Sequence, residues 1–265
     1  MGGAERSARK RKQQQTSAAN AVAAARSGGG RSKVLITVVA VVILGVAVIG
    51  GVIYTNSQKD TTENSAIPAQ QHAADYPVRR DGPLAVAGKD DAKVTLDVYE
   101  DFLCPACGQF EARNADAIES KLRDGSVQVR YHMLPMLNGQ SDPPGYSRDS
   151  ANAGLCAADA GQFPAFHASL FRAQPEEGAR GYDKAQLIKL GQDLGISDPQ
   201  FAECVNSGRY DQILAAELEK TRSTPYLQQT FPNGRTGFAT PTIATGEQIV
   251  ESAEPGWLEK LLAGR

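Results

Sequence analysis

The stretch Lys93-Val-Thr-Leu-Asp-Val-Tyr99, continued by Glu100-Asp-Phe-Leu-Cys104-Pro-Ala-Cys107, decides the fold of this chain. Its first half alternates apolar and polar residues, which is the period of a half-buried strand. Residues 108–122 then follow a helical pattern, which ends at 123–125. A Cys-x-x-Cys motif therefore lies where a strand runs into a helix. Pro105 suits the first helical position, because its missing N–H costs nothing there.

This placement predicts redox chemistry. A thiolate at a helix N-terminus faces unpaired backbone N–H groups, so we expect a lowered pKa for Cys104. Cys107 lies one turn further in and should be shielded and less acidic. Cys104 is then the sulfur that forms a mixed disulfide with a substrate, and Cys107 resolves it.

The motif also has two plainer interpretations, a structural disulfide and half of a zinc site. Zinc usually needs two clustered ligand pairs, but Cys156 and Cys204 are 48 residues apart and have no histidine at a ligand spacing. We therefore expect no metal site. His132 and His167 are interpreted as ordinary packing or surface residues.

Beyond the motif, the two ends of the chain differ in charge. Residues 1–33 carry eight Lys or Arg and one acid, whereas the whole chain has a net charge of −2, so the remainder is acidic. An acidic body argues against nucleic acid as a ligand, because phosphate binding needs basic patches. We interpret 1–33 as a disordered basic tail that lies in the cytoplasm.

Residues 34–54 form an uncharged run of 21 residues rich in Val, Ile and Leu. As a helix this run would extend roughly 31 Å, enough to cross a bilayer and anchor the chain in membrane lipid. A buried core helix would show a polar face, and a cleaved signal peptide would be shorter. Because the basic residues precede the run, the positive-inside rule places everything after it outside the cytoplasm. We expect a polar linker over 55–75 and one folded domain over 76–265.

Four features together resemble the DsbA-like thiol–disulfide oxidoreductases. They are the Asp101–Cys107 motif, a long helical middle over about 145–230, the loop Gly237-Phe-Ala-Thr-Pro-Thr242, and a last helix near 256–263. The resemblance implies an α/β thioredoxin-like fold with an inserted all-helical subdomain, here preceded by a single transmembrane helix and the basic tail. It also implies a redox-active disulfide within the chain and no bound cofactor.

The resemblance extends to the residues around the cysteines. It implies a cis bond before Pro241 beside the active disulfide, whereas an ordinary trans proline at a strand start is the plainer alternative. Thr240 would help to bind substrate and tune the sulfurs, and Pro105 and Ala106 would complete the surroundings of Cys104.

The chain departs from the family at the buried acid. Members often carry a buried acid six residues before the first cysteine, and that position is Val98 here. Asp97 should point to the opposite face, while Glu100 and Asp101 lie nearer the motif. Any of these acids, or none, could take its place.

The second cysteine pair, Cys156 and Cys204, lies within the helical middle among apolar neighbours. In an oxidising compartment the plain interpretation is a structural disulfide. A second redox-active pair is the alternative, although neither cysteine has a strand–helix junction beside it.

The sequence therefore predicts a single-pass protein of the cell membrane that donates disulfides to exported proteins. The resemblance implies a membrane quinone-linked partner of the DsbB or vitamin-K-epoxide-reductase type as reoxidant. Two alternatives stay open. One is a reductase or isomerase of the same fold, and the other is a non-catalytic binding module with two structural disulfides.

Overall fold

The computed structural model describes residues 62–71 and 74–264. The predicted basic tail (1–33), the predicted membrane span (34–54) and the first part of the predicted linker lie outside these residues. Among the residues described, no helix combines the length and the apolar character that crossing a bilayer requires. The anchor thus stays a prediction.

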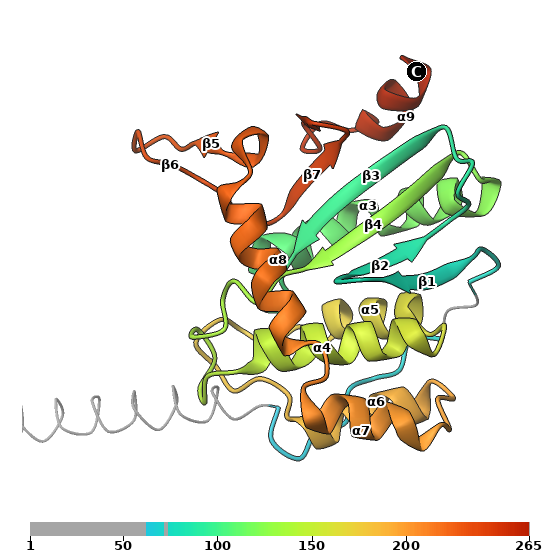
Figure 1. Ribbon diagram of the computed structural model, residues 1–265, viewed down its shortest axis with the longest axis vertical. Helices are drawn as coiled ribbons and strands as arrows, with labels where there is room; N and C mark the ends of the chain where they lie inside the picture. Colours follow the sequence, from blue (N-terminus) through green and yellow to red (C-terminus); the bar gives the residue numbers. More distant parts are fainter. Residues whose placement is uncertain (1–61, 72–73, 265) are drawn as a thin grey trace, which may run out of the picture. The chain divides into compact units, whose positions relative to one another are not determined.

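A six-stranded sheet forms the centre of the domain, in the order β1-β2-β4-β3-β7-β8 (Figure 1). Its central pair, β3 and β4, is parallel, and all other neighbours are antiparallel. Seven residues of β3 pair with β4, and five of them are buried in succession up to the motif. The strands are β1 (Val78–Asp81), β2 (Leu84–Ala87), β3 (Val94–Glu100), β4 (Val127–Met133), β7 (Thr242–Thr245) and β8 (Gln248–Ile249).

Helix α3 (Pro105–Asp124) makes the crossover between the two parallel strands. It ends at Gly125, whose φ of 79° is the left-handed conformation that glycine adopts readily at a helix end. The last helix, α9 (Trp257–Ala263), is tied to α3 because the Trp257 indole N–H donates to the Asn114 side chain at 2.9 Å.

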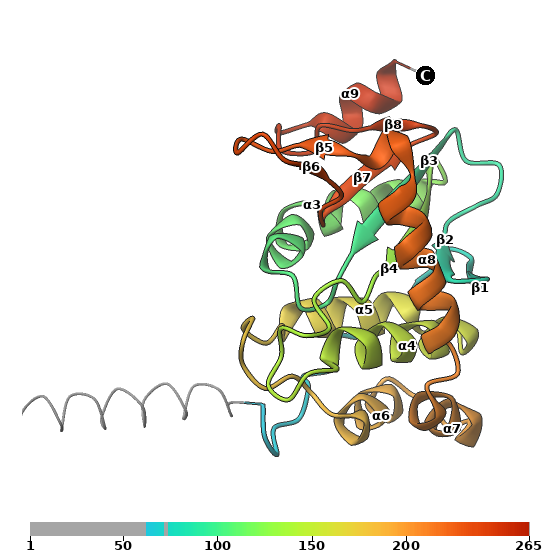
Figure 2. The ribbon, with the colours of Figure 1, turned by 60° about the vertical axis from the view of Figure 1, so that its left-hand side comes forward.

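An all-helical subdomain is inserted between β4 and β7. Helices α4 and α5 lie nearer the sheet, and α6 and α7 form the layer beyond them (Figure 2). A disulfide between Cys156 of α4 and Cys204 of α7 joins the two layers, with a Cα–Cα distance of 6.0 Å. The helices are α4 (Tyr146–Asp159), α5 (Phe163–Arg172), α6 (Lys184–Asp193), α7 (Pro199–Ser207) and α8 (Asp211–Ser223).

The subdomain is followed by a short segment that leads back to the sheet. It contains a 3-10 turn, η1 (Pro225–Leu227), and a small hairpin of β5 (Gln229–Thr230) and β6 (Thr236–Gly237). The α/β architecture with a helical insertion agrees with the expectation from the sequence.

Residues 62–71 differ from the polar linker expected over 55–75, because they pack against the helical subdomain. The side chain of Ile67 is buried, and the Thr62 hydroxyl donates to the Arg180 carbonyl at 2.7 Å. The Gln186 amide of α6 donates to the carbonyls of Thr62 and Ser65. This segment is therefore held by long-range contacts that a local reading of its composition could not detect.

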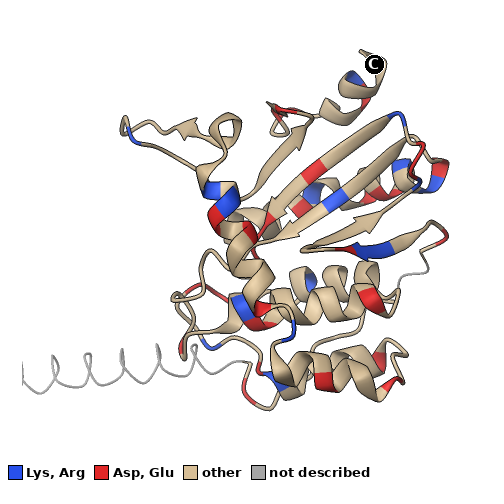
Figure 3. Ribbon diagram, viewed as in Figure 1, with Lys and Arg blue, Asp and Glu red and all other residues tan. Residues whose placement is uncertain are grey.

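Lys and Arg alternate with Asp and Glu along the ribbon (Figure 3). Within the described part of the chain, no helix or strand stands out as a continuous basic stripe of the kind that binds phosphate backbones.

The disulfide between the two helical layers allows a prediction about the stability of the domain. Replacing both Cys156 and Cys204 by Ser should lower the free energy of unfolding by about 2–4 kcal/mol, because the disulfide restricts the unfolded chain. Denaturant unfolding of the oxidised variant against the wild type measures the difference. Thiol–disulfide exchange at Cys104 and Cys107 should persist at low temperature, and its complete loss in a folded variant would favour a redox role for the second pair.

Candidate active site

The cysteines of the motif occupy different environments at the start of α3. Cys104 is the N-cap residue of the helix and Pro105 is its first residue. Cys104 is 7% exposed, whereas Cys107 is fully buried, and both are free thiols in this structure. Pro105 and Ala106 are exposed. Cys104 is thus the less buried of the two thiols, and it borders the exposed turn formed by Pro105 and Ala106.

The helix start favours a thiolate at Cys104. The pKa of Cys104 is lowered to about 6, chiefly by a hydrogen bond from the Cys107 thiol and further by the backbone N–H groups of Cys107 and Ala106, although burial opposes the shift. Burial raises the pKa of Cys107 well above its ordinary value. The structure thus separates an acidic thiol at the helix start from a more deeply buried thiol that stays protonated.

The loop before β7 closes the other side of the site. The bond between Thr240 and Pro241 is cis, as the resemblance implied. The Cys104 thiol donates to the Thr240 carbonyl, with 3.4 Å between sulfur and oxygen. The backbone of Thr240 therefore lies against the sulfur that would bond to a substrate. A second cis bond, between Asp142 and Pro143, was not anticipated from the sequence.

Gln174, just beyond α5, holds the motif from the helical subdomain. Its amide nitrogen donates to the carbonyls of Phe102 at 3.0 Å and Cys104 at 2.9 Å. Gly108 makes room for it, since a Cβ at that position would lie 2.3 Å from the Gln174 Oε1 atom. The sequence analysis missed this residue, because nothing local to Gln174 indicates a contact 70 residues away.

The three acids near the motif, Asp97, Glu100 and Asp101, make different contacts. Asp97 points away from the cysteines and binds Arg130 and His132. Burial raises the pKa of Asp97, but hydrogen bonds from His132 and Arg130 outweigh it, and the net direction is down. Asp101 accepts hydrogen bonds from the backbone N–H groups of Leu103 at 2.8 Å and Leu137 at 2.7 Å, so it shapes the turn before the motif.

Glu100, the third acid, is fully buried and lies 3.1 Å from the Nε2 atom of His167. His132 and His167 were expected to be ordinary packing or surface residues. Both are buried, and His132 bridges Asp97 and Glu217 with its two ring nitrogens, at 3.0 and 2.9 Å. Each imidazole joins elements that are distant in sequence, a role that no local pattern reveals.

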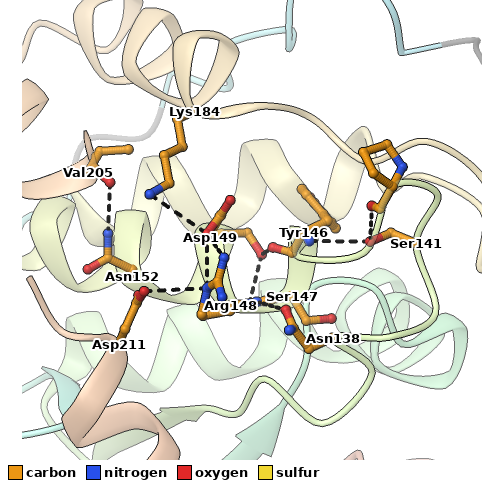
Figure 4. Close-up of polar contacts among 12 residues, drawn as sticks. Asn138, Ser141, Tyr146, Ser147, Arg148, Asp149, Asn152, Lys184, Val205 and Asp211 are labelled. Carbon is orange, nitrogen blue, oxygen red and sulfur yellow. Dashed lines mark hydrogen bonds and ion pairs between the residues drawn. The ribbon is translucent and has the colours of Figure 1, made fainter. Parts of the chain in front are cut away.

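The loop over 134–145 connects β4 to the helical subdomain through polar contacts (Figure 4). The Asn138 side-chain oxygen accepts from the Arg148 backbone N–H at 3.1 Å, and the Ser141 hydroxyl oxygen accepts from the Tyr146 N–H at 3.3 Å. Both bonds satisfy N–H groups at the open start of α4. The loop that contacts Asp101 is thus also fixed to the helical subdomain.

Comparisons with known proteins agree with this geometry. A family model described as Thioredoxin matches residues 81–262. The crystal structure of reduced DsbA from Mycobacterium tuberculosis is 26% identical with a TM-score of 0.58, covering 69% of this chain and 92% of that one. The reduced disulfide bond oxidoreductase DsbG from the same organism is 28% identical with a TM-score of 0.55, covering 72% of this chain and 86% of that one.

A curated relative, the serine/threonine-protein kinase PknE of Mycobacterium tuberculosis, is 30% identical over 196 residues. The match covers 72% of this chain but 33% of PknE, so the chain spans about a third of the length of this relative. The predicted thioredoxin-like fold is confirmed by the comparisons. The predicted enzyme class agrees with the names of these structural relatives, of which DsbG is called a disulfide bond oxidoreductase.

The Gln174 contacts predict a measurable effect on stability. Gln174→Ala should lower the free energy of unfolding of the reduced protein by about 1–3 kcal/mol, because two backbone hydrogen bonds are lost. Gly108→Ala should lower the free energy of unfolding less in the Gln174→Ala background than in the wild type, because the Gln174 side chain that the new methyl group would displace is already absent. Gln109→Ala, at an exposed neighbouring position, is the control. Additive effects of the first two changes would contradict the assigned contact.

The Cys104 environment predicts a pH profile. Because the folded-state pKa of Cys104 lies near 6 and below its unfolded value, the thiolate stabilises the reduced protein fully above the unfolded pKa, and this stabilisation is lost as the pH falls through 6. The alkylation rate of Cys104, followed by peptide mass spectrometry, should be half-maximal near pH 6. A midpoint near 8.5, the value of an ordinary cysteine, would contradict the assignment.

Proposed function

The chain belongs to the thioredoxin family, and on this premise we propose that it is a protein thiol–disulfide oxidoreductase that donates disulfides through Cys104 and Cys107. The observation that carries the proposal is the position of Cys104 at the N-cap of α3, with Cys107 one turn further in, where the helix start lowers the pKa of the Cys104 thiol. A stabilised thiolate is a good leaving group, and it favours the reduced form of the pair. The oxidised pair is then a strong oxidant.

The reaction follows from the two environments. A substrate thiolate attacks the sulfur of Cys104, the bond between Cys104 and Cys107 breaks, and Cys107 leaves as a thiol after taking up a proton. A second substrate thiolate attacks the substrate sulfur of this mixed disulfide, and Cys104 leaves as a thiolate. The substrate loses two electrons and gains a disulfide, and the enzyme gains the two electrons.

The cis loop supports substrate binding in this scheme. The Thr240 carbonyl lies against the Cys104 sulfur, so a substrate bonded to this sulfur would lie beside the backbone of the Thr240–Pro241 loop. Thr240 and Pro241 are therefore proposed as substrate-contacting residues, with Pro105 and Ala106 on the exposed side of the sulfur.

The wider setting is part of the proposal. Residues 34–54 would anchor the protein in membrane lipid as a single span, with the N-terminus in the cytoplasm and the folded domain outside, where exported proteins are the substrates. The enzyme would need a reoxidant, for which we propose a membrane quinone-linked partner of the DsbB or vitamin-K-epoxide-reductase type. The acidic composition of the body supports the exclusion of nucleic acid.

A binding module is the second candidate function. Its support is the match to PknE, a protein kinase that is about three times longer than the matched part. In this case both cysteine pairs would be structural, and binding to a partner would survive the loss of Cys104. A reductase or isomerase of the same fold would keep the chemistry and reverse its direction.

Two cysteine variants test the proposal on the full chain with a reduced, unfolded substrate protein. Cys107→Ser, given the disulfide-bonded form of the same substrate, should accumulate a mixed disulfide that is visible on non-reducing gels and absent after reduction, because the Cys104 thiolate attacks the substrate disulfide, one substrate sulfur leaves as a thiolate, and the Cys107 thiol that would resolve the product is missing. Cys104→Ser should form none and lose turnover. A folded Cys107→Ser variant that forms no mixed disulfide, or a Cys104→Ser variant with normal turnover, would contradict the enzymatic proposal.

A further inference from the structure

Three side chains from separate elements meet behind the motif, where they form what we call the Glu100–Glu111–His167 cluster. Glu100 ends β3, Glu111 lies on α3 and His167 on α5. One ligand atom from each lies within 4.8 Å of the others. The Nε2 atom of His167 is 3.1 Å from Glu100 Oε2, and its Nδ1 atom is 4.0 Å from Glu111 Oε2.

One oxygen of each carboxyl group in the cluster lacks a hydrogen-bond donor. The side chains of Glu100, Glu111 and His167 are 0%, 10% and 6% exposed. Oε1 of each glutamate is buried and has no hydrogen-bond partner. Burial raises the pKa of both carboxyl groups to about 8, and in Glu111 the nearby Glu100 adds to the shift. Two buried carboxyl groups with one imidazole between them require a positive charge, which protons or a cation would supply.

We propose that the Glu100–Glu111–His167 cluster is a binding site for one divalent transition-metal ion of the zinc type. Carboxylate oxygens and an imidazole nitrogen bind such ions at about 2.0–2.2 Å. Tetrahedral bond angles then place neighbouring ligand atoms about 3.4 Å apart, so small side-chain shifts bring all three atoms into position. The imidazole favours a transition metal over calcium or magnesium, which take oxygen ligands.

The cluster lies near enough to both cysteines to interact with them electrostatically, but cavities reach it from another side. Glu111 and His167 line a cavity of about 50 Å³, and Glu111 also lines a larger surface hollow of about 360 Å³ between α3 and α5. An ion can therefore reach Glu111 without passing Cys104. The fourth ligand position would be left to water, as in zinc sites with three protein ligands. The site adds a metal to a chain for which the sequence predicted none.

The test uses the oxidised full-length protein, in which Cys104 and Cys107 are joined and cannot act as thiolate ligands. Cobalt(II) and zinc(II) serve as probes. We expect one equivalent to bind, with a visible cobalt spectrum that lacks an intense sulfur-to-metal band. We also expect binding to release protons, because the carboxyl groups must ionise.

Matched variants assign the site. Glu111→Gln and His167→Gln should each lower the affinity by at least about 100-fold, since each removes one of three protein ligands. Glu203→Gln, an exposed acid of α7, should leave it unchanged. Circular dichroism checks that the variants fold. If a variant does not fold, the wild-type stoichiometry and proton release still decide the question.

Three results would overturn the proposal. The first is that the oxidised wild type takes up no cobalt, in which case the cluster holds protons only. Binding could be equal in all variants, or it could occur in the reduced protein alone and show a thiolate band, which would place the metal on the dithiol. None of these results depends on enzymatic turnover. The metal-site proposal can therefore be refuted without refuting the proposed function, and the reverse also holds.

Discussion

The stabilisation of one negative charge, the thiolate of Cys104, is the constraint on which the rest of the site depends. Strand β3 and helix α3 meet at this residue, so its sulfur faces the backbone N–H groups of the first helical turn. Cys107 supplies a hydrogen bond from the interior and is itself held neutral by burial. The same short segment therefore sets both the reactivity of one thiol and the protection of the other.

The helical subdomain contributes to this arrangement from outside the central sheet. Gln174 fixes two carbonyls of the motif, and His167 of α5 reaches the carboxyl group at the end of β3. The loop over 134–145 contacts Asp101 and the start of α4 together. The helical subdomain thus supports the redox centre through these hydrogen bonds. The disulfide from Cys156 to Cys204 joins the two helical layers of the subdomain.

Features that depend on local sequence could be predicted. The period of residues 93–99, Pro105 at the helix start and Gly125 at its end specify β3 and α3 directly. The Thr240–Pro241 loop and the pairing of Cys156 with Cys204 were expected from the family resemblance and from composition. The helix at 184–193 begins at the N-cap Asp183, a residue type that favours this position, and its side chain accepts the Gln186 N–H.

Contacts between distant segments could not be predicted in this way. A single sequence does not show which distant positions are neighbours in space. It therefore could not reveal the contacts of Gln174, the partners of His132 and His167, or the packing of residues 62–71. The acid that accompanies the motif illustrates the difference. The sequence limits it to Asp97, Glu100 and Asp101, and only the fold shows that all three are buried and that Glu100 is the one beside Glu111 and His167.

The reduction potential of the Cys104–Cys107 pair tests the central claim most directly. The full-length protein is equilibrated in glutathione buffers of graded poise and alkylated, and free thiols at the two positions are counted by peptide mass spectrometry. A stabilised Cys104 thiolate predicts that the pair stays reduced in all but the most oxidising mixtures. A pair that stays oxidised until the buffer is strongly reducing would contradict the account, because the thiolate would then give the reduced form no advantage.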